Sequence, residues 1–181
     1  FAVDGASRMQ RLINDLLAIS RMQGGRVSRE KERLPLSSLL REVVELIKGE
    51  ALERQVELVA ELPEELPLIS ANREDLTRVF TNLVDNAIKY NRPGGKVFVR
   101  ARAIDAFLQV EVQDTGIGIP KEERGKIFDE FYRVKTKETQ RISGTGLGLC
   151  IAKKILEAHN GEIEVESQMN AGSTFRVLLP I

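Results

Sequence analysis

The chain has 181 residues, which suits one domain with a hydrophobic core and a short appended element rather than two full domains. Lys and Arg together number 27 and Asp and Glu also number 27, so the overall charge gives no reason to expect nucleic acid or an anionic membrane as a partner. Hydrophobic residues make up 42% and charged residues 30%, a balance that excludes a disordered chain and a fibrous repeat.

The first segment predicts an amphipathic helix over residues 1–23. Its apolar residues recur at spacings of three and four: Met9, Leu12, Leu16 and Ile19. Two glycines then end the helical pattern, and a charged connector follows. We therefore expect a domain boundary near Val27, with a helical segment at residues 1–27 and a larger domain at residues 28–181.

The next segment predicts two helices with a strand between them. Ser37 or Ser38 can cap a helix that runs to about Arg54, and the sequence VELVAEL after it alternates as a strand does. Asn72 can cap another helix, whose apolar stripe ends before the turn-forming sequence PGG at residues 93–95.

The second half of the chain predicts two hairpins and a final helix. KVFVRARA and FLQVEVQD are joined by a short turn and form the first hairpin, and a glycine loop and a short helix from about Lys121 follow it. Helical spacing predicts a helix from about Gly146 to His159. It contains Cys150, the only cysteine, which we interpret as a small core residue. EIEVES and STFRVLL form the second hairpin.

These elements predict an α+β fold. The strands and helices do not alternate one for one and the hairpins are antiparallel, so we expect a two-layer α/β sandwich. Its sheet is mixed and mostly antiparallel, with helices on one face, and the N-terminal amphipathic helix is added to it. No apolar run approaches the roughly 18 residues that cross a bilayer. The start of the chain has no signal-peptide pattern, so we expect a water-soluble, cytoplasmic domain.

The sequence TNLVDNAIKYN, at the end of the third helix, is a candidate ligand site. Asn82 and Asn86 lie one turn apart on one face, and Lys89 and Tyr90 lie on the following turn. An amide oxygen can ligate Mg²⁺, an ammonium can approach a phosphate, and a tyrosine ring can stack on a purine. A polar helix surface explains this segment equally well when it is taken alone.

The sequence DTGIGIP directly follows a predicted strand. Gly116 and Gly118 permit close approach of the backbone to a ligand, and Asp114 lies where the strand ends. A carboxylate there can accept a hydrogen bond from the 6-amino group of adenine, whereas guanine would present an oxygen to it. A tight turn before a helix is the alternative, and the coincidence of an acid with two glycines favours the ligand site.

The sequence SGTGLGL opens the last helix. Gly144, Gly146 and Gly148 expose backbone N–H groups at a helix N-terminus, where a phosphate is favoured. The preceding sequence FDEFYRVKTKETQRI carries four basic residues, among them Arg133, and can close over a triphosphate as a lid. A solvated loop is the alternative for this stretch.

Read in order, TNLVDNAIKYN, DTGIGIP, FDEFYRV and GTGLGL resemble the N, G1, F and G2 boxes of the catalytic ATP-binding domain of two-component sensor histidine kinases. Order, spacing and flanking elements match over about residues 30–181. The family fold is an α/β sandwich that also occurs in DNA gyrase, mismatch-repair ATPases and heat-shock chaperone ATPases.

The resemblance implies ATP and Mg²⁺ as ligands and gives each motif residue a role. It implies that Asn86 ligates Mg²⁺ with Asn82 beside it, that Tyr90 stacks near adenine and that Asp114 reads its amino group. It further implies that Lys89 and Arg133 face the phosphates and that Phe128 and Phe131 anchor the lid. The remaining implied site positions lie in the two glycine loops: Gly116, Gly118, Ile119, Gly144, Thr145, Gly146, Leu147 and Gly148.

One position distinguishes this chain from the hydrolytic relatives. They have a glutamate one turn before the metal-binding asparagine, and here that position is Asn82, which cannot act as a base. Asp85 is poorly aimed to replace it. The site is therefore expected to hold ATP for transfer to an acceptor. A nucleotide-gated ATPase of the gyrase or chaperone kind and a degenerate nucleotide-binding module are the alternatives.

The resemblance also implies partners. In the family, a phosphate-accepting histidine lies on the first helix of a dimerising hairpin, and residues 1–23 resemble the end of its second helix. His159, the only histidine, is not expected to accept phosphate. We expect a histidine-bearing helical domain of the same or a partner subunit, a response regulator receiver domain, and a homodimeric full-length protein. Many relatives are bacterial proteins anchored in the inner membrane, which is the expectation for the parent protein here.

Overall fold

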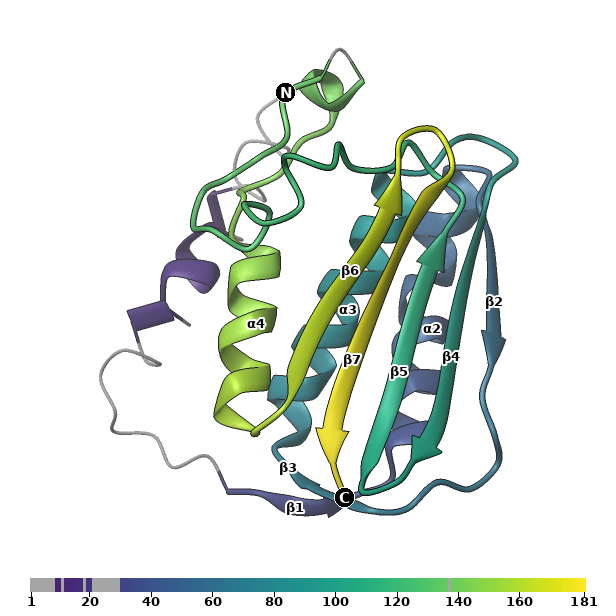
Figure 1. Cartoon of the computed structure of the whole chain (residues 1–181), viewed down its shortest axis with the longest axis vertical. Coiled ribbons are helices and arrows are strands. Elements are labelled where there is room, and N and C mark those ends of the chain that lie inside the picture. The colour runs from purple at the N-terminus through teal and green to yellow at the C-terminus, as the bar shows by residue number, and fades with distance from the viewer. Residues whose placement is uncertain (1–8, 11, 18, 21–29, 137) are drawn as a thin grey trace.

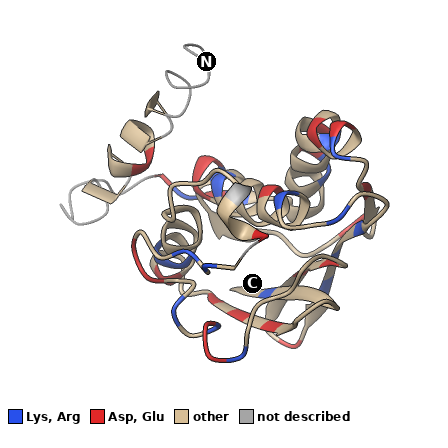
Figure 2. Ribbon diagram, turned by 90° about the horizontal axis from the view of Figure 1, so that it is seen from above, with Lys and Arg blue, Asp and Glu red and all other residues tan. Residues whose placement is uncertain are grey.

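Alternate residues of the strands and one stripe of each helix form a shared apolar layer. The computed structural model describes residues 9–10, 12–17, 19–20, 30–136 and 138–181. Within them, a sheet faces the viewer and the main helices lie behind it (Figure 1). Seen from above, the helices form one layer and the sheet the other (Figure 2). The predicted two-layer α/β sandwich is confirmed.

The elements of the main domain follow one another between residues 32 and 180. The helices are α2 (Leu36–Glu53), α3 (Arg73–Lys89) and α4 (Gly148–Ala158), with a 3-10 turn η1 (Thr139–Arg141). The strands are β1 (Glu32–Leu34), β2 (Glu57–Glu61), β3 (Ile69–Ala71), β4 (Lys96–Ile104), β5 (Phe107–Asp114), β6 (Glu162–Gln168) and β7 (Gly172–Pro180).

The main sheet is mixed, as the sequence predicts. Its strand order is β2-β4-β5-β7-β6, and only the pairing of β2 with β4 is parallel. Both predicted hairpins, β4–β5 and β6–β7, are confirmed. Strands β1 and β3 form a separate antiparallel pair, and the short strand β3 was not predicted from the sequence.

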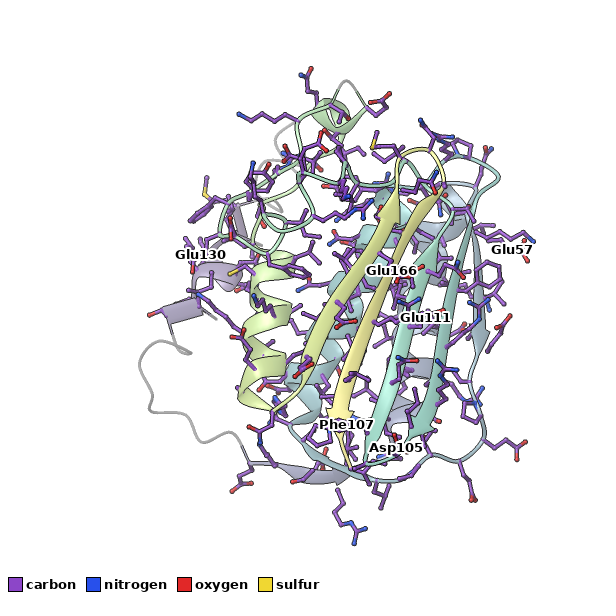
Figure 3. The ribbon with its side chains drawn as sticks, viewed as in Figure 1. Glu57, Asp105, Phe107, Glu111, Glu130 and Glu166 are labelled. Atoms are coloured by element: carbon purple, nitrogen blue, oxygen red, sulfur yellow. The ribbon has the colours of Figure 1, made fainter. Side chains whose placement is uncertain are left out.

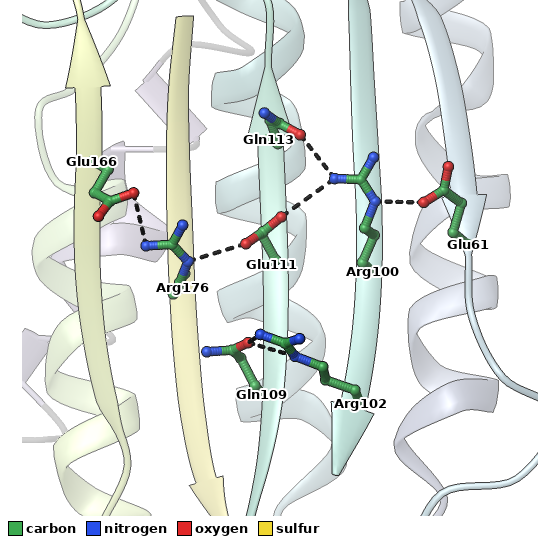
Figure 4. A network of polar contacts seen from close by, with 8 residues as sticks. All are labelled: Glu61, Arg100, Arg102, Gln109, Glu111, Gln113, Glu166 and Arg176. Carbon is green, nitrogen blue, oxygen red and sulfur yellow. Dashed lines mark hydrogen bonds and ion pairs between the residues drawn. The ribbon is translucent and has the colours of Figure 1, made fainter. Parts of the chain in front are cut away.

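The outer face of the sheet carries polar side chains in place of a second helical layer. Glu111 of β5 bonds to Arg100 of β4 at 3.3 Å and to Arg176 of β7 at 3.0 Å. Glu61 of β2 and Glu166 of β6 complete the row at its two ends, so that it crosses all five strands (Figure 4). The row alternates three carboxylates with two guanidinium groups and leaves the outer face solvated.

Local signals were partly correct about helix boundaries. Asn72 caps α3 as predicted, because its Oδ1 accepts a hydrogen bond from the N–H of Asp75 at 3.0 Å. The serine cap predicted for α2 is wrong, since Pro35 occupies the cap position and no side chain caps it. The helix predicted from Lys121 is also wrong, because residues 121–131 form successive turns.

The described part of the N-terminal segment is helical and packs one side against the domain. Ile19 is 7% exposed and joins the core, and Leu12 packs against that core. Met9 and Leu16, on the same predicted stripe, are exposed. The predicted boundary near residue 27 lies outside the described residues. In the described part of the chain, no helix has the length and apolarity needed to cross a membrane.

Candidate nucleotide-binding site

A cavity of about 420 Å³ opens where α3 and β5 end and α4 begins. These ends lie at the top of the view in Figure 1. Most of the residues that the sequence predicted for the site line this cavity: Asn82, Asn86, Lys89, Tyr90, Asp114, Gly118, Ile119, Arg133, Gly144, Thr145, Gly146 and Gly148. Three motifs far apart in the sequence therefore converge on one space.

Asp114 supplies a buried carboxylate to this cavity. On β5 the inward positions carry Leu108, Val110 and Val112, and Asp114 continues that series, which leaves it 5% exposed. Burial raises the pKa of Asp114 to about 6, although hydrogen bonds from the backbone N–H groups of Gly116 and Ser173 oppose this shift.

The two backbone donors hold Asp114 by one oxygen. The N–H of Gly116 reaches Oδ1 at 2.7 Å and the N–H of Ser173 reaches it at 3.3 Å. Among the described residues no hydrogen bond reaches Oδ2. The carboxylate is thus fixed in orientation and keeps one oxygen for a donor in the cavity, such as an exocyclic amine.

Gly118 makes the turn after Asp114 possible. It has a φ of +72°, and a Cβ placed on it would lie 2.0 Å from the carbonyl oxygen of Gln168, the last residue of β6. A side chain at this position would therefore force two backbone segments apart. The glycines of DTGIGIP are required first by this close packing, beside any contact with a ligand.

Helix α3 lines the cavity with amide and charged groups. The side-chain amide of Asn82 donates to the carbonyl oxygen of Gly148 at 3.1 Å and ties α3 to the start of α4. Asp85 and Lys89 form an ion pair one turn apart. The sequence interpretation set Asp85 aside, yet its side chain lines the cavity and neutralises the predicted phosphate-binding lysine.

The loop before α4 carries the predicted lid residues. Arg133 lines the cavity and donates to the carbonyl oxygens of Thr139 and Ile142. Phe128 packs against the core, and the ammonium of Lys153 lies 5.6 Å from its ring centre. The Arg133 bonds hold the loop to itself, and the contact between Phe128 and Lys153 holds it against α4.

Four predicted site residues do not line the cavity. They are Gly116, Phe128, Phe131 and Leu147. Leu147 is fully buried in the core, and Gly116 acts through its backbone contact with Asp114. Phe131 has a φ of +61° and is 58% exposed, so its ring is not packed against the core.

Sequence reasoning missed several residues that line the cavity. Asp15 of the N-terminal segment, Ser173 of β7 and Phe175 of β7 come from elements outside the motifs. Other positions inside or next to the quoted sequences line the cavity and were not named as site residues: Thr81, Asp85, Ala87, Ile117, Ile127, Tyr132, Val134, Thr139, Ser143 and Leu149. The inward alternation of β7 could have indicated Phe175, whereas no local pattern indicates Asp15.

The remaining candidate groups are structural. The ring of His159 is 5% exposed, its Nε2 accepts from the N–H of Asn72 at 3.1 Å, and its Nδ1 lies 2.8 Å from the carbonyl oxygen of Ile155. Burial raises the pKa of the Cys150 thiol, which keeps it protonated. Both side chains pack between elements, as the sequence interpretation expected.

Comparison with known proteins agrees with this geometry. Residues 71–181 match the family described as histidine kinase-, DNA gyrase B-, and HSP90-like ATPase. This match covers more than half of the chain. The chain belongs to this ATPase family. Within the family, the chain is a catalytic ATP-binding domain of the histidine kinase type.

Individual relatives include sensor kinases. It is 36% identical to the sensor histidine kinase WalK of Bacillus subtilis over 96% of this chain and 28% of WalK. The crystal structure of full-length ShkA in complex with AMPPNP matches with a TM-score of 0.86 and 29% identity, over 98% of this chain and 36% of ShkA. ThkA in complex with the response regulator TrrA matches with a TM-score of 0.75 and 27% identity, over 98% of this chain and 48% of ThkA.

The chain spans about 28% of the length of the curated kinase relatives it matches. Those proteins are therefore much longer than the domain described here. The comparison establishes what kind of domain this is, and the activity of the whole protein follows from it only as a proposal.

Proposed function

We propose that the domain binds ATP with Mg²⁺ and positions the γ-phosphoryl group for attack by a histidine side chain on a companion helical domain. One observation carries this proposal: the buried carboxylate of Asp114, the amide-bearing end of α3 and the glycine loop before α4 line one cavity. The complex of ShkA with AMPPNP, a protein with the same fold, supports a nucleotide as the ligand.

The inner end of the cavity suits adenine. The free Oδ2 of Asp114 can accept a hydrogen bond from the 6-amino group, and the carbonyl oxygen of guanine would repel it. Apolar side chains of Ile119, Ile127 and Phe175 line the same cavity and can contact the faces of the base. Tyr90 also lines the cavity and can stack beside adenine, as the family resemblance implies.

The outer end suits a triphosphate. Gly144, Gly146 and Gly148 line it with backbone N–H groups close to the start of α4. Lys89 and Arg133 can each exchange its present partner for phosphate oxygens, because neither partner lies on a rigidly held strand. Bonded to the ligand, these two cations would stabilise the charge on the phosphates while the γ-phosphoryl group is transferred.

Asn86 is the proposed Mg²⁺ ligand. The described residues contain no group of three His, Cys, Asp or Glu side chains that could hold a metal ion by themselves. This fits Mg²⁺, which is commonly bound through one or two protein oxygens together with water and substrate phosphates. The amide oxygen of Asn86 and the carboxylate of Asp85 both line the cavity and can supply those oxygens. The ion would neutralise charge on the phosphates.

Transfer is favoured over hydrolysis by the role of Asn82. Its amide holds the carbonyl oxygen of Gly148, and an amide cannot take a proton from water. Asp85 and Asp114 have other proposed roles, because Asp85 lies beside the Mg²⁺ site and Asp114 accepts from adenine. We infer that an acceptor histidine, with its own acidic neighbour, supplies the base.

The partners follow from the same proposal. His159 is buried and bonded to the cap of α3, so the acceptor is a histidine of a helical dimerisation domain in the same or a partner subunit. The complex of ThkA with the response regulator TrrA supports a receiver domain as the next acceptor. A homodimeric, membrane-anchored bacterial parent protein with this domain in the cytoplasm stays a prediction.

The proposal is tested by incubating the chain with radiolabelled ATP, Mg²⁺ and a fragment that carries the histidine helix. We expect label on the histidine of the companion fragment and none on the domain alone. Steady release of phosphate without the companion would reject transfer as the function and favour an ATPase of the gyrase kind.

A further inference from the structure

One face of the N-terminal helical segment points at the domain. Leu12, Asp15 and Ile19 are separated by three and four residues and so share a helix face. Leu12 packs against the core and Ile19 is buried in it. Asp15 lies between these two apolar contacts, which hold its carboxylate at the edge of the nucleotide cavity.

Asp15 bonds to one residue of the nucleotide cavity, Thr145, and to Arg78 of α3 outside the cavity lining. Its Oδ1 accepts a hydrogen bond from Nη2 of Arg78 on α3 at 2.6 Å, and the same nitrogen lies 3.4 Å from the carbonyl oxygen of Asn14. Its Oδ2 accepts from the hydroxyl of Thr145 in the glycine loop at 3.2 Å. One carboxylate therefore joins the N-terminal helix, α3 and the loop before α4.

This contact changes what the glycine loop can offer to a ligand. The hydroxyl of Thr145 has one proton, which points to Asp15, and its oxygen accepts from the N–H of Leu147 at 3.2 Å. Both donors are thereby directed to protein atoms. A phosphate that enters the loop needs the hydroxyl to turn away from the carboxylate.

Charge opposes the simultaneous presence of the carboxylate and a triphosphate. Asp15 lines the same cavity as Lys89 and Arg133, the cations proposed for the phosphates. A carboxylate there repels an approaching polyanion. Asp15 also neutralises Arg78, which lies one turn before Asn82 on the same side of α3.

We propose that Arg78 and Thr145 form a carboxylate-binding site, which the chain's own helix fills through Asp15 in the absence of nucleotide and which a triphosphate empties. The inference rests on the proposed nucleotide site. Binding of the triphosphate frees the hydroxyl and the guanidinium together and loosens the helix. The coupling is reciprocal, so a docked helix weakens binding of the triphosphate by the same factor.

The direct test compares the parent chain with Asp15→Asn, a change that keeps shape and removes charge. Calorimetric titration with AMPPNP is expected to give a dissociation constant about two- to fivefold lower in the variant, the size of one partly exposed charge contact. Adenosine, which has no phosphate, is expected to bind both proteins equally.

Asp105→Asn is the matched control. Asp105 is exposed in the β4–β5 turn with a φ of +51°, which Asn tolerates, and it lies at the end of the sheet away from the lid residue Glu130 (Figure 3). It alters net charge equally, so its affinity for AMPPNP should equal that of the parent. An equal gain in Asp105→Asn would overturn the proposal, as would no gain in Asp15→Asn.

Hydrogen exchange in peptides spanning residues 12–17 gives a second readout. In the parent, AMPPNP is expected to speed exchange there and adenosine to leave it unchanged; in Asp15→Asn exchange is already fast. Slower or unchanged exchange on addition of AMPPNP would overturn the proposal. A parent chain that binds no AMPPNP rejects the nucleotide site itself, whereas a parent that binds it while Asp15→Asn alters neither readout rejects only the carboxylate site.

Discussion

The outer face of the sheet and the cavity at its end both carry many charges, but they hold them differently. On the outer face, Glu111 bonds to two arginines that are held in turn by acids on the edge strands. Every member of this row has a partner on a neighbouring strand whose position the backbone ladder fixes. Such a row stabilises the sheet and has little left to offer a ligand.

At the cavity, the charged groups either make a contact that a ligand can replace or keep an atom without a partner among the described residues. Lys89 pairs with its neighbour one turn away, Arg133 caps backbone carbonyls, and Asp114 keeps one oxygen without a hydrogen bond from the described residues. In this fold, the capacity to bind a ligand therefore depends on charged groups whose bonds are replaceable or incomplete, and not on the number of charges.

The largest expected effect comes from removing a proposed metal ligand. Asn86→Ala should abolish the gain in affinity for AMPPNP that Mg²⁺ gives the parent, a loss at least as large as the roughly 10- to 100-fold that follows loss of an outer-shell partner. Titrations with and without Mg²⁺ measure it. A variant whose affinity still responds to Mg²⁺ as the parent does would place the metal elsewhere.

The next effect concerns the unpaired carboxylate at the cavity. Because burial raises the pKa of Asp114 to about 6, it is half ionised near that pH. Adenosine should bind about tenfold more weakly at pH 5 than at pH 7, since the ionised acceptor is the stronger one. Adenosine is the probe because phosphates titrate in the same range. Equal affinity at both pH values would contradict the assignment.

The same pKa has a consequence for folding with a definite sign. The folded value lies above the ordinary value of 3.8, so the native state binds the extra proton between about pH 4 and 6. The stability that Asp114 contributes to the folded state is therefore complete below pH 4 and is lost as the pH rises through 6. Urea unfolding of the parent should show this fall in the free energy of unfolding, and Asp114→Asn, which has no carboxyl group to titrate there, should not.

The smallest effect is expected on the outer face. Glu111→Gln removes the shared charge between Arg100 and Arg176 and should lower the free energy of unfolding by about 1 kcal/mol, with less loss at high salt. Its affinity for AMPPNP should equal that of the parent. A change in affinity would break the distinction between the two regions.

Much of the fold could be predicted from the sequence because its signals are local. The apolar stripe and the Asn72 cap define α3, and alternation defines both hairpins. The strand β3 has three residues and no period to detect, and its pairing with β1 is a tertiary contact. The turns from Lys121 are held by packing of the lid against α4, which overrides the local helical pattern.

The motifs also indicated most of the cavity, since each lies at the end of a predictable element. Their pairing could not be predicted, because it depends on contacts between distant segments. The bonds from Ser173 to Asp114 and from Thr145 to Asp15 join residues 59 and 130 positions apart. Sequence spacing therefore predicted the candidate ligand groups and left open which protein atoms they bond to.

The central claim is that Asp114, the end of α3 and the glycine loop hold one adenine nucleotide. Calorimetric titration of the parent, Asp114→Asn and Asp105→Asn with AMPPNP tests it most directly. We expect saturable binding by the parent and by Asp105→Asn, and a loss of about 1.5–3 kcal/mol of binding free energy in Asp114→Asn. An Asp114→Asn chain that binds AMPPNP as tightly as the parent would contradict the account.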